Sequence, residues 1–402
     1  MAASGEKPYR VYKGGRQKGK VPLPHREAQR RKREQEPRRQ DPQRRDVRRR
    51  PQRVFSRRRA FFWSLIGVIV LLIVWALAGY LSVRSGVADA NKRIETQAPG
   101  IDSVLSPTGG LMLSNPSNIL LLGTDHSENG QAGRSTDDHS DSLMLLHTDP
   151  SKHRLVFLSL PRDLRASIPG YGTSKINAAM QLGGPKLAIK TVEGFTGLKI
   201  NHVVVDFGSF VKLIDAVGGI DVNVPENILS NRFDCPYSTA TRCQQWQGWS
   251  FHKGVQHMDG HRALIYSRIR ENRLNPGDSD ISRGVRQQQV MQQTLTKLAS
   301  VGTFFRLPFS GGDLMKPLST DLSTNQFLQL AWVKFRAGQT LHCRLGGRDL
   351  GDGYLQPSEN NIYVIQTLLG HTAPQPPNPA DGPFGPGCLT GNQAFGSSSP
   401  SK

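Results

Sequence analysis

The sequence predicts an α/β domain, with a central mixed β-sheet covered by helices on both faces, preceded by one transmembrane helix. Two observations carry this prediction. Short apolar runs bounded by turn residues alternate with segments of helical spacing over residues 118–300, a pattern typical of α/β sheets. Upstream of them lies AFFWSLIGVIVLLIVWALAGYLSV, residues 60–83, which carries no charge. The chain should therefore hold one folded domain behind a membrane anchor.

Residues 1–59 form a strongly basic N-terminal tail. They hold 22 Lys and Arg against 6 Asp and Glu, so 16 of the 20 net positive charges of the chain lie there. The tail is rich in Arg, Gln and Pro and nearly free of aliphatic runs, so it cannot bury enough apolar surface to offset the entropy of ordering. We expect it to be disordered.

The uncharged run is long enough to cross a membrane. As a helix at about 1.5 Å per residue, it spans roughly 36 Å, against a hydrocarbon core of about 30 Å. A cleaved signal peptide is the alternative, but the long leader and the lack of a clear small-x-small cleavage site argue against it. Basic flanks stay cytoplasmic, and Arg57, Arg58 and Arg59 abut the run. The prediction is a single-pass cell-membrane protein with a cytoplasmic N-terminus and an extracytoplasmic domain.

Beyond the anchor the sequence divides into three segments. Residues 84–117 contain Gly and Pro and are expected to be a linker. Residues 118–370 are expected to form the folded domain, and residues 371–402 a tail rich in Pro, Gly and Ser. Each element of the domain is expected from its own pattern. Apolar runs of strand length stand at 118–125, 142–149, 154–163, 202–207 and 220–225. Helical spacing stopped by glycine, or a long polar-apolar repeat, stands at 175–184, 185–197, 209–219 and 283–300.

The four cysteines all follow the anchor, where an extracytoplasmic location lets disulfides persist. Three pairings are possible, and the spacing alone does not choose among them. Free thiols are a further alternative, and metal ligation is disfavoured because no pair has a C-x2-C spacing. The pairing that we favour joins Cys235 to Cys243 and Cys343 to Cys388.

Charged residues stand where apolar runs end. Asp125 follows the first predicted strand, Asp141 precedes the second, and Arg162 and Asp163 follow the third. Ligands of open α/β sheets bind beyond strand ends, so these groups are candidates for one site. Taken singly, each is more often a cap or turn residue.

A second group of charges lies in YSRIRENRLNPGDSDISRGVRQQQ, residues 266–289. If ALIYSRIR is a strand, Arg268 and Arg270 share one face and repel each other unless an anion lies between them. Arg283 and Arg286 open the next predicted helix, where backbone N–H groups favour an anion. A solvated basic face is the alternative.

Phosphoryl transfer from a polyphosphate needs two kinds of group. Acids recruit Mg²⁺, and arginines stabilise the phosphoryl oxygens. The sequence has no P-loop, GxSxG, HExxH or kinase signature, so the common nucleotide and hydrolase classes have no support. A metal-dependent glycosyltransferase is an alternative because Asp278-Ser279-Asp280 has the D-x-D form.

The ordered blocks NILLLGTD, HSDSLMLLHTDP, LSLPRDLRASIPGYGTSKINAAMQLGGP, VVVDFGSFVKLIDAVGGIDVNVP and MDGHRALIYSRIREN with DSDISRGVRQQQV resemble the LytR-CpsA-Psr (LCP) family of bacterial cell envelopes. The resemblance implies an α-β-α fold and a Mg²⁺-dependent phosphotransferase. Such an enzyme moves a glycopolymer from a polyprenyl-pyrophosphate lipid to peptidoglycan as a phosphodiester. Membrane lipid is a further expected partner, and specific nucleic acid is not. A membrane-bound envelope regulator and a pyrophosphatase acting on the lipid are the alternatives.

The resemblance also implies residue roles. Asp125 and Asp141 match metal ligands, and Asp163 completes the PRD motif. Asp280 matches a residue that helps to activate the acceptor hydroxyl, and His139 stands where the family most often has Arg, so its phosphate contact would depend on pH. The residues that match pyrophosphate ligands are Arg162, Arg268, Arg270, Arg283 and, more weakly, Gln287. A lipid-chain pocket is implied too, but its candidate lining is as compatible with ordinary core: Phe207, Phe210, Leu213 and Ile214.

Overall fold

The computed structural model describes residues 9–11, 20–22, 57–124, 140–207, 210–275, 280–298, 300–382 and 384–390. The chain divides into two units, Met1–Leu65 and Ile66–Lys402. In the tail that we expected to be disordered, strands β1 (Tyr9–Val11) and β2 (Lys20–Pro22) pair antiparallel. The other residues of that tail up to Ser56 lie outside the description.

Helix α2 (Arg57–Gln97) contains the predicted membrane anchor. Among the described residues it is the one helix that is long and apolar enough to span a membrane, with mean hydropathy 2.6 in its most apolar window. The prediction that a linker begins at residue 84 is wrong, because α2 continues through residues 84–97. The extension buries Val87, Ala90 and Ile94 in the domain. Their spacing of three and four is helical, and intervening charges hide it.

Seven strands form the central sheet in the order β13-β8-β3-β4-β5-β14-β17. The pairs β3/β8 and β5/β14 are parallel and the other pairs antiparallel, so the predicted mixed sheet is confirmed. Four of the seven, β3, β4, β5 and β8, lie where the sequence placed apolar runs or close to it, whereas β13, β14 and β17 were not predicted; the fifth predicted strand, β9, lies outside this sheet. The bounds are β3 (Ser117–Thr124), β4 (Ser140–Asp149), β5 (Arg154–Leu160), β8 (His202–Phe207), β13 (Leu318–Thr320), β14 (Gln339–Arg344) and β17 (Gly387–Thr390), with β9 (Ile220–Val224) outside this sheet.

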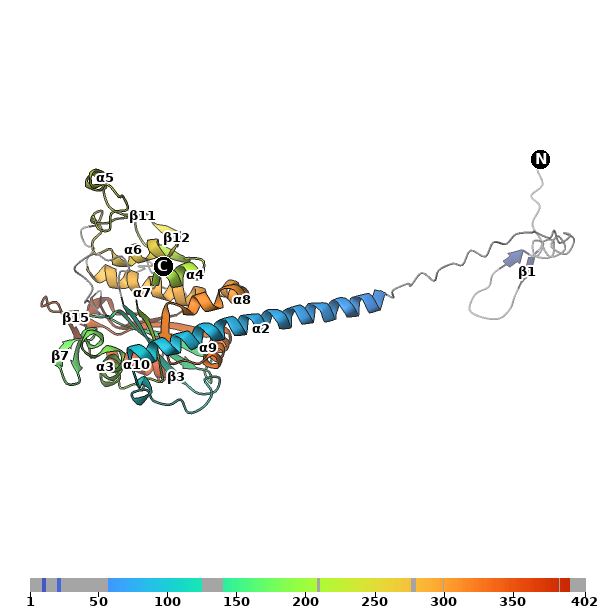
Figure 1. The fold of residues 1–402 in the computed structure, drawn as a ribbon, viewed down its shortest axis with the longest axis horizontal. Helices are drawn as coiled ribbons and strands as arrows, with labels where there is room; N and C mark the ends of the chain where they lie inside the picture. The colour runs from blue at the N-terminus through green and yellow to red at the C-terminus, as the bar shows by residue number, and fades with distance from the viewer. Residues whose placement is uncertain are drawn as a thin grey trace. The chain divides into compact units, whose positions relative to one another are not determined.

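Helices cover both faces of the sheet, as predicted. Successive residues of β3 point to opposite faces, so Leu120 and Leu122 pack in one apolar cluster and Ile119 and Leu121 in another. Helices α3 and α10 contribute to the first of these clusters, and α7 and α9 to the second. In Figure 1, α4, α6 and α7 lie in the upper part of the domain and α3 and α10 in the lower part. The helices and 3₁₀ turns of the domain are η1 (Ile101–Ser103), α3 (Ala178–Thr196), α4 (Phe210–Ala216), α5 (Ala240–Gln245), α6 (Gly260–Arg268), α7 (Asp280–Leu298), α8 (Val301–Met315), α9 (Thr324–Arg336), α10 (Asn361–Leu369) and η2 (Pro379–Asp381).

Helix α3 has the interruption that the sequence predicts. Gly183 and Gly184 leave the helical conformation immediately before Pro185, so two helical segments meet at a kink. Gly184 has φ 62°, which favours glycine, and proline can begin the second segment because its missing N–H is not needed there.

The segment ALIYSRIR, by contrast, is not a strand. It forms most of α6, which begins after Asp259, whose side chain accepts a hydrogen bond from the Arg262 backbone N–H at 2.7 Å. The buried Ala263 and Tyr266 stand three apart, which is helical spacing. A short apolar run fits the two-residue period of a strand as well as the 3.6-residue period of a helix. The Asp259 cap favours the helix.

A third apolar cluster lies beside the sheet, around the antiparallel pair of β9 and β12 (Gly254–Met258). Helices α4, α6, α7 and α8 contribute to it. It includes Leu213 and Ile214, both buried, so these two are ordinary core. Phe207 and Phe210 have side chains outside the description. The remaining short strand pairs are β6 (Arg165–Ile168) with β7 (Gly172–Lys175), β10 (Ile228–Leu229) with β11 (Ser250–Phe251), and β15 (Gly347–Asp349) with β16 (Leu355–Pro357).

Both favoured disulfides are confirmed. Cys235 is bonded to Cys243, and Cys343 to Cys388. The second bond joins β14 to β17, where the two cysteines are directly paired in the register. Ordered structure therefore continues beyond residue 370, where we expected the tail to begin.

Candidate functional site

The strand ends that carry the predicted acids meet at one edge of the sheet. β3 ends at Thr124, which pairs with Ser140 at the start of β4, and Leu160 at the end of β5 pairs with Leu143. The positions that follow these ends are therefore neighbours, which is what the sequence predicted for the acidic and basic groups there. We call this edge, at the ends of β3 and β5 and the start of β4, the site edge.

The register of β3 and β4 is irregular at the site edge. Gly123 pairs with Ser142 and Thr124 with Ser140, so Asp141 is passed over. Such bulges are frequent beside active sites, because they change the direction of one residue. The side chains of Asp141 and Asp280, and the whole of Asp125 and His139, lie outside the description. Their metal-binding and substrate-binding roles stay predictions.

The PRD motif follows β5 and forms a local ion cluster. Arg162 Nε lies 3.4 Å from Asp163 Oδ2, and Lys175 Nζ donates to Asp163 Oδ1 at 2.7 Å. Lys175 comes from β7, and the sequence analysis did not select it. The backbone also fixes Asp163, because its carbonyl accepts a hydrogen bond from the Leu355 N–H at 2.9 Å. Asp163 therefore holds two cations at the site edge.

Arg268 and Arg270 do not lie side by side on a strand. Arg268 is the last residue of α6, and Arg270 is exposed two residues later. The Nη1 of Arg268 donates to Asp234 Oδ2 at 2.6 Å. Asp234 has φ 47° and precedes the disulfide-bonded Cys235. Asp234 was not selected from the sequence, where nothing connects it with an arginine 34 residues later.

Helix α7 brings Arg283 and Gln287 toward the site edge. These residues are four apart, and Met291 is four further on, so all three share one helix face. The Met291 Cε lies 3.7 Å from the place where a Cβ on Gly123 of β3 would stand. Gln287 and Arg283 are about 6 and 12 Å from Met291 along the helix, toward its N-terminus. Arg283 is 5% exposed, and it lies in the first turn of α7, as predicted.

Arg286 and Arg273, the other arginines of this segment, have structural contacts. Arg286 is buried, and its Nη2 donates to the Ile269 carbonyl at 2.8 Å. This bond ties the end of α6 to α7, together with one from the Tyr266 hydroxyl to Gln289 Oε1 at 3.0 Å. Arg273 is exposed and donates to the Gln247 carbonyl at 2.8 Å.

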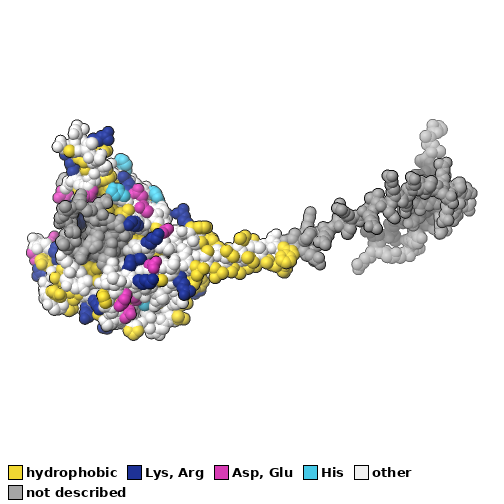
Figure 2. All heavy atoms as spheres, viewed as in Figure 1, with side chains coloured by type: hydrophobic (Ala, Val, Ile, Leu, Met, Phe, Trp, Pro, Cys, Tyr) yellow, Lys and Arg dark blue, Asp and Glu magenta, His cyan; other side chains and the backbone are white. Residues whose placement is uncertain are grey.

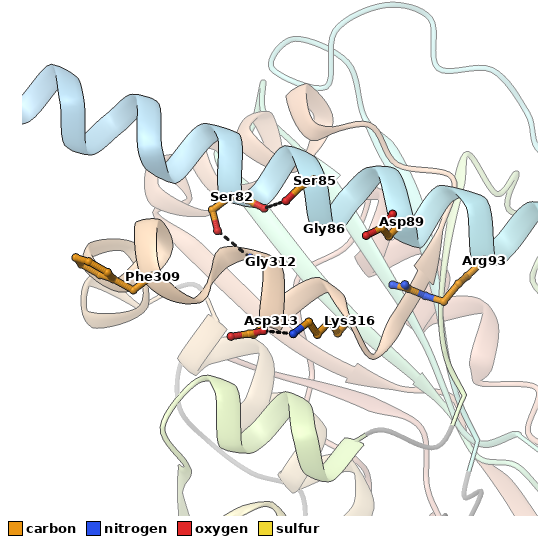
Figure 3. A pocket seen from close by; sticks show the side chains of 9 residues that line it. All are labelled: Ser82, Ser85, Gly86, Asp89, Arg93, Phe309, Gly312, Asp313 and Lys316. Carbon is orange, nitrogen blue, oxygen red and sulfur yellow. Dashed lines mark hydrogen bonds and ion pairs between the residues drawn. The ribbon is translucent and has the colours of Figure 1, made fainter.

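A separate polar pocket of about 280 Å³ lies between α2 and α8. Figure 3 shows its nine lining residues, among them the ion pair of Lys316 with Asp313 at 2.5 Å. Arg93 lines it too, and its guanidinium also donates to the Met315 and Leu318 carbonyls, at 2.7 Å each from Nη2. The predicted site residues whose side chains the structure describes are not among those that line this pocket.

The family model of the LytR_cpsA_psr family matches residues 77–339, more than half of the chain. The chain belongs to this family. The match begins inside α2 and includes every predicted site residue, so the resemblance seen in the sequence blocks is confirmed at the level of the family.

Several relatives of this LytR_cpsA_psr protein carry enzyme names, and one, MsrR of Staphylococcus aureus, is named as a regulatory protein. The chain is 33% identical over 276 residues to the polyisoprenyl-teichoic acid–peptidoglycan teichoic acid transferase TagU of Bacillus mycoides, covering 67% of this chain and 80% of that protein. It is 29% identical over 317 residues to the corresponding transferase TagV of Bacillus subtilis, covering 76% of each. The crystal structure of B. subtilis TagV superposes with a TM-score of 0.49 at 27% identity, covering 64% of this chain and 96% of that one.

Proposed function

We propose that this protein transfers a glycopolymer from a polyprenyl-pyrophosphate lipid carrier to peptidoglycan by Mg²⁺-dependent phosphoryl transfer. The observation that carries the proposal is the meeting of the acid-bearing strand ends and the Arg162–Asp163 pair at the site edge, in a chain that has relatives named as transferases to peptidoglycan. Glycopolymer and peptidoglycan are therefore the partners, and the product is a phosphodiester.

The arginines have the roles that phosphoryl transfer requires. Arg162, Arg268, Arg270 and Arg283 bind the pyrophosphate oxygens, because guanidinium groups match phosphate geometry and stay charged. An acceptor hydroxyl attacks the phosphorus atom that bears the glycopolymer. The bond from that phosphorus to the bridging oxygen breaks, and polyprenyl phosphate leaves. Asp280, at the start of α7, takes the proton of the hydroxyl.

Asp163 acts by positioning. Its carboxylate is occupied by Lys175 and Arg162, so it holds cations in place rather than contacting the substrate. Gln287, one turn from Arg283 on the same helix face, is a further donor to the pyrophosphate. His139 supplies a contact that strengthens when the imidazole is protonated.

Two aspartates are the proposed Mg²⁺ ligands. The described residues include no group of three or more His, Cys, Asp or Glu that would hold a metal. The register nevertheless puts Asp125 and Asp141 next to the paired residues Thr124 and Ser140. Two carboxylates and the phosphate oxygens of a substrate are a donor set that suits Mg²⁺. When bound, the ion neutralises charge on the pyrophosphate.

The membrane arrangement is part of the proposal. α2 crosses the cell membrane, with the basic residues before it in the cytoplasm and the domain outside, where the glycopolymer carrier meets peptidoglycan. The two disulfides support an oxidising, extracytoplasmic location.

The proposal is tested with the full-length protein in proteoliposomes that contain a polyprenyl-pyrophosphate oligosaccharide. Peptidoglycan and Mg²⁺ are each added or left out, and release of polyprenyl phosphate and attachment of the sugar are measured. We expect both products only when peptidoglycan and Mg²⁺ are present. Equal release without peptidoglycan would instead make the protein a pyrophosphatase, and transfer in EDTA would exclude the metal.

Variants separate chemistry from folding in this assay. Arg283→Ala removes a proposed pyrophosphate ligand and is expected to lower the transfer rate about 100-fold or more. Arg273→Ala is the matched control, because it is in the same segment but exposed and bonded only to a loop carbonyl in the described contacts. Wild-type transfer by Arg283→Ala would contradict the assignment.

A further inference from the structure

Helix α8 lies alongside the outer end of the apolar part of α2. The rings of Trp75 and Phe305 have centroids 5.7 Å apart. Further along both helices, a Cβ on Gly86 would stand 2.7 Å from Met315 Cβ. Residue numbers rise together along the two helices, so α8 runs parallel to α2. The first residues of α8 therefore reach back beside the membrane-spanning run.

Small residues hold the two helices in close contact. A Cβ on Gly311 would stand 2.8 Å from Val83 Cγ2, which is closer than side chains approach each other. The backbone N–H of Gly312 donates to Ser82 Oγ at 3.0 Å. Because the backbones approach this closely at Gly86 and Gly311, α8 is a fixed neighbour of α2.

The outward face of α8 is apolar. Phe309 is 84% exposed and Phe305 is 58% exposed. Between Lys297 and Asp313 the sequence has a single charged residue, Arg306. Arg306 is exposed, and its Nη1 lies 2.6 Å from the place of a Cβ on Gly218, so its guanidinium reaches the loop after α4. Phe305 and Phe309 stand four apart and share a face of the helix, which Arg306, one residue after Phe305, does not share.

The change from uncharged to charged residues occurs at the same level on both helices. On α2 the first charge after the apolar run is Arg84, and on α8 the charges resume at Asp313. The two positions correspond, because Val83 opposes Gly311. Beyond this level lies the polar pocket, with Phe309 among its lining residues, and Figure 3 shows Phe309 at the end of the pocket from which α2 arrives. In Figure 2, the hydrophobic surface of α2 from residue 66 onward continues onto the adjoining part of the domain.

We propose that the first part of α8, residues 301–309, enters the outer leaflet of the membrane beside α2, with Phe305 and Phe309 among the acyl chains. The apolar run of α2 exceeds a hydrocarbon core of about 30 Å by roughly 6 Å. Trp75, eight residues before Val83, then lies about 6–9 Å inside the outer edge of the core. This depth is that of interfacial helices, about 5–10 Å.

The partner of this surface is therefore the lipid bilayer, and the anchor has two helices where the sequence shows one. Because α8 also packs in the third apolar cluster with α4, α6 and α7, its insertion would fix the orientation of the domain relative to the membrane surface. The inference needs α2 to span the membrane, and it does not depend on the transfer chemistry proposed above.

Photo-crosslinking to lipid tests the inference. The full-length protein, carrying p-benzoylphenylalanine in place of Phe309, is reconstituted into phosphatidylglycerol and phosphatidylcholine vesicles, irradiated and analysed by mass spectrometry for phospholipid adducts. Tyr363 on α10 is the matched control, because it is an aromatic residue of comparable exposure, 63%, on another helix. Leu72 in α2 reports whether the anchor is in the bilayer.

We expect adducts at positions 309 and 72, with the yield at 309 on the order of ten-fold above that at 363, since a buried ring favours the apolar layer by about that factor or more. Adducts at 72 alone, or equal yields at 309 and 363, would overturn the role of α8. Adducts at none of the three positions would overturn both the spanning helix and the docking of α8. None of these outcomes depends on whether the protein transfers a glycopolymer.

Discussion

The candidate site has two sides that are held in different ways. The sheet side consists of Arg162, Asp163 and Lys175, and the helix side of Arg268, Arg270 and Arg283. On the sheet side, Asp163 binds cations that are near in sequence, on a backbone set by strand pairing. On the helix side, Arg268 binds the distant Asp234 in a loop closed by the Cys235–Cys243 disulfide. The helix side thus depends on tertiary contacts, and we expect it to be the adjustable half.

The largest expected effect is on the helix side. Arg268→Ala removes a proposed pyrophosphate ligand at the end of α6, and we expect transfer to fall about 100–1,000-fold, the usual loss for one group that stabilises a transition-state anion. Transfer rate and thermal unfolding are measured together. Arg262→Ala, on the same helix, is the control and should keep the wild-type rate. An equal loss in both variants would point to damage of α6 rather than of the site.

At the end of β4 away from the site edge, stability is expected to depend on pH through His147. Burial lowers the pKa of His147 from 6.5 to about 4, and its Nδ1 lies 2.8 Å from Asn118 Oδ1. Between pH 4 and 6.5 the unfolded chain binds a proton that the folded chain does not, so the free energy of unfolding falls as the pH falls through this window. The loss is on the order of 3 kcal/mol.

Chemical denaturation of the full-length protein in detergent, at several pH values, measures this dependence. His147→Gln keeps a polar side chain but does not titrate, and it should have a flatter profile between pH 4 and 6.5. An unchanged profile in this variant would show that another group is responsible.

Arg286 distinguishes structural from site arginines on the helix side. Arg286→Ala removes the bond to the Ile269 carbonyl and leaves a buried acceptor, so we expect the free energy of unfolding to fall by about 2 kcal/mol. Denaturant titration measures the loss. The exposed Arg273 is the control, and Arg273→Ala should change stability by less than about 0.5 kcal/mol. If Arg286→Ala left stability intact but abolished transfer, Arg286 would belong to the site instead.

The smallest expected effect comes from opening the loop that carries Asp234. Cys235 and Cys243 are half-buried, whereas Cys343 and Cys388 are buried, so mild reductant should open the first disulfide before the second. Freeing Asp234 loosens Arg268, and we expect KM for the pyrophosphate lipid to rise by up to about ten-fold, or about 1.4 kcal/mol. A paired Cys235→Ser and Cys243→Ser variant should show the same rise and no further change with reductant.

The sequence predicted much of the sheet side and misread part of the helix side. The strands that end at the site edge are apolar runs with turn residues on both sides, so the places of these strands followed from the pattern. The apolar residues of ALIYSRIR fit the spacing of a strand and that of a helix. The strand prediction, which placed Arg268 and Arg270 on one face, was wrong. The Asp259 cap was the available signal for the helix.

The sequence by itself determined the helix that is long and apolar enough to span a membrane, the α/β class, the family blocks and the candidate charges, because each of these is a local pattern of side chains along the chain. Only the tertiary structure decided which distant groups meet. Asp234 with Arg268, Lys175 with Asp163 and α8 with α2 are contacts between segments brought together by packing. The burial of α2 beyond residue 83 is also a tertiary effect. Its apolar stripe is buried only because the sheet and α8 pack against it.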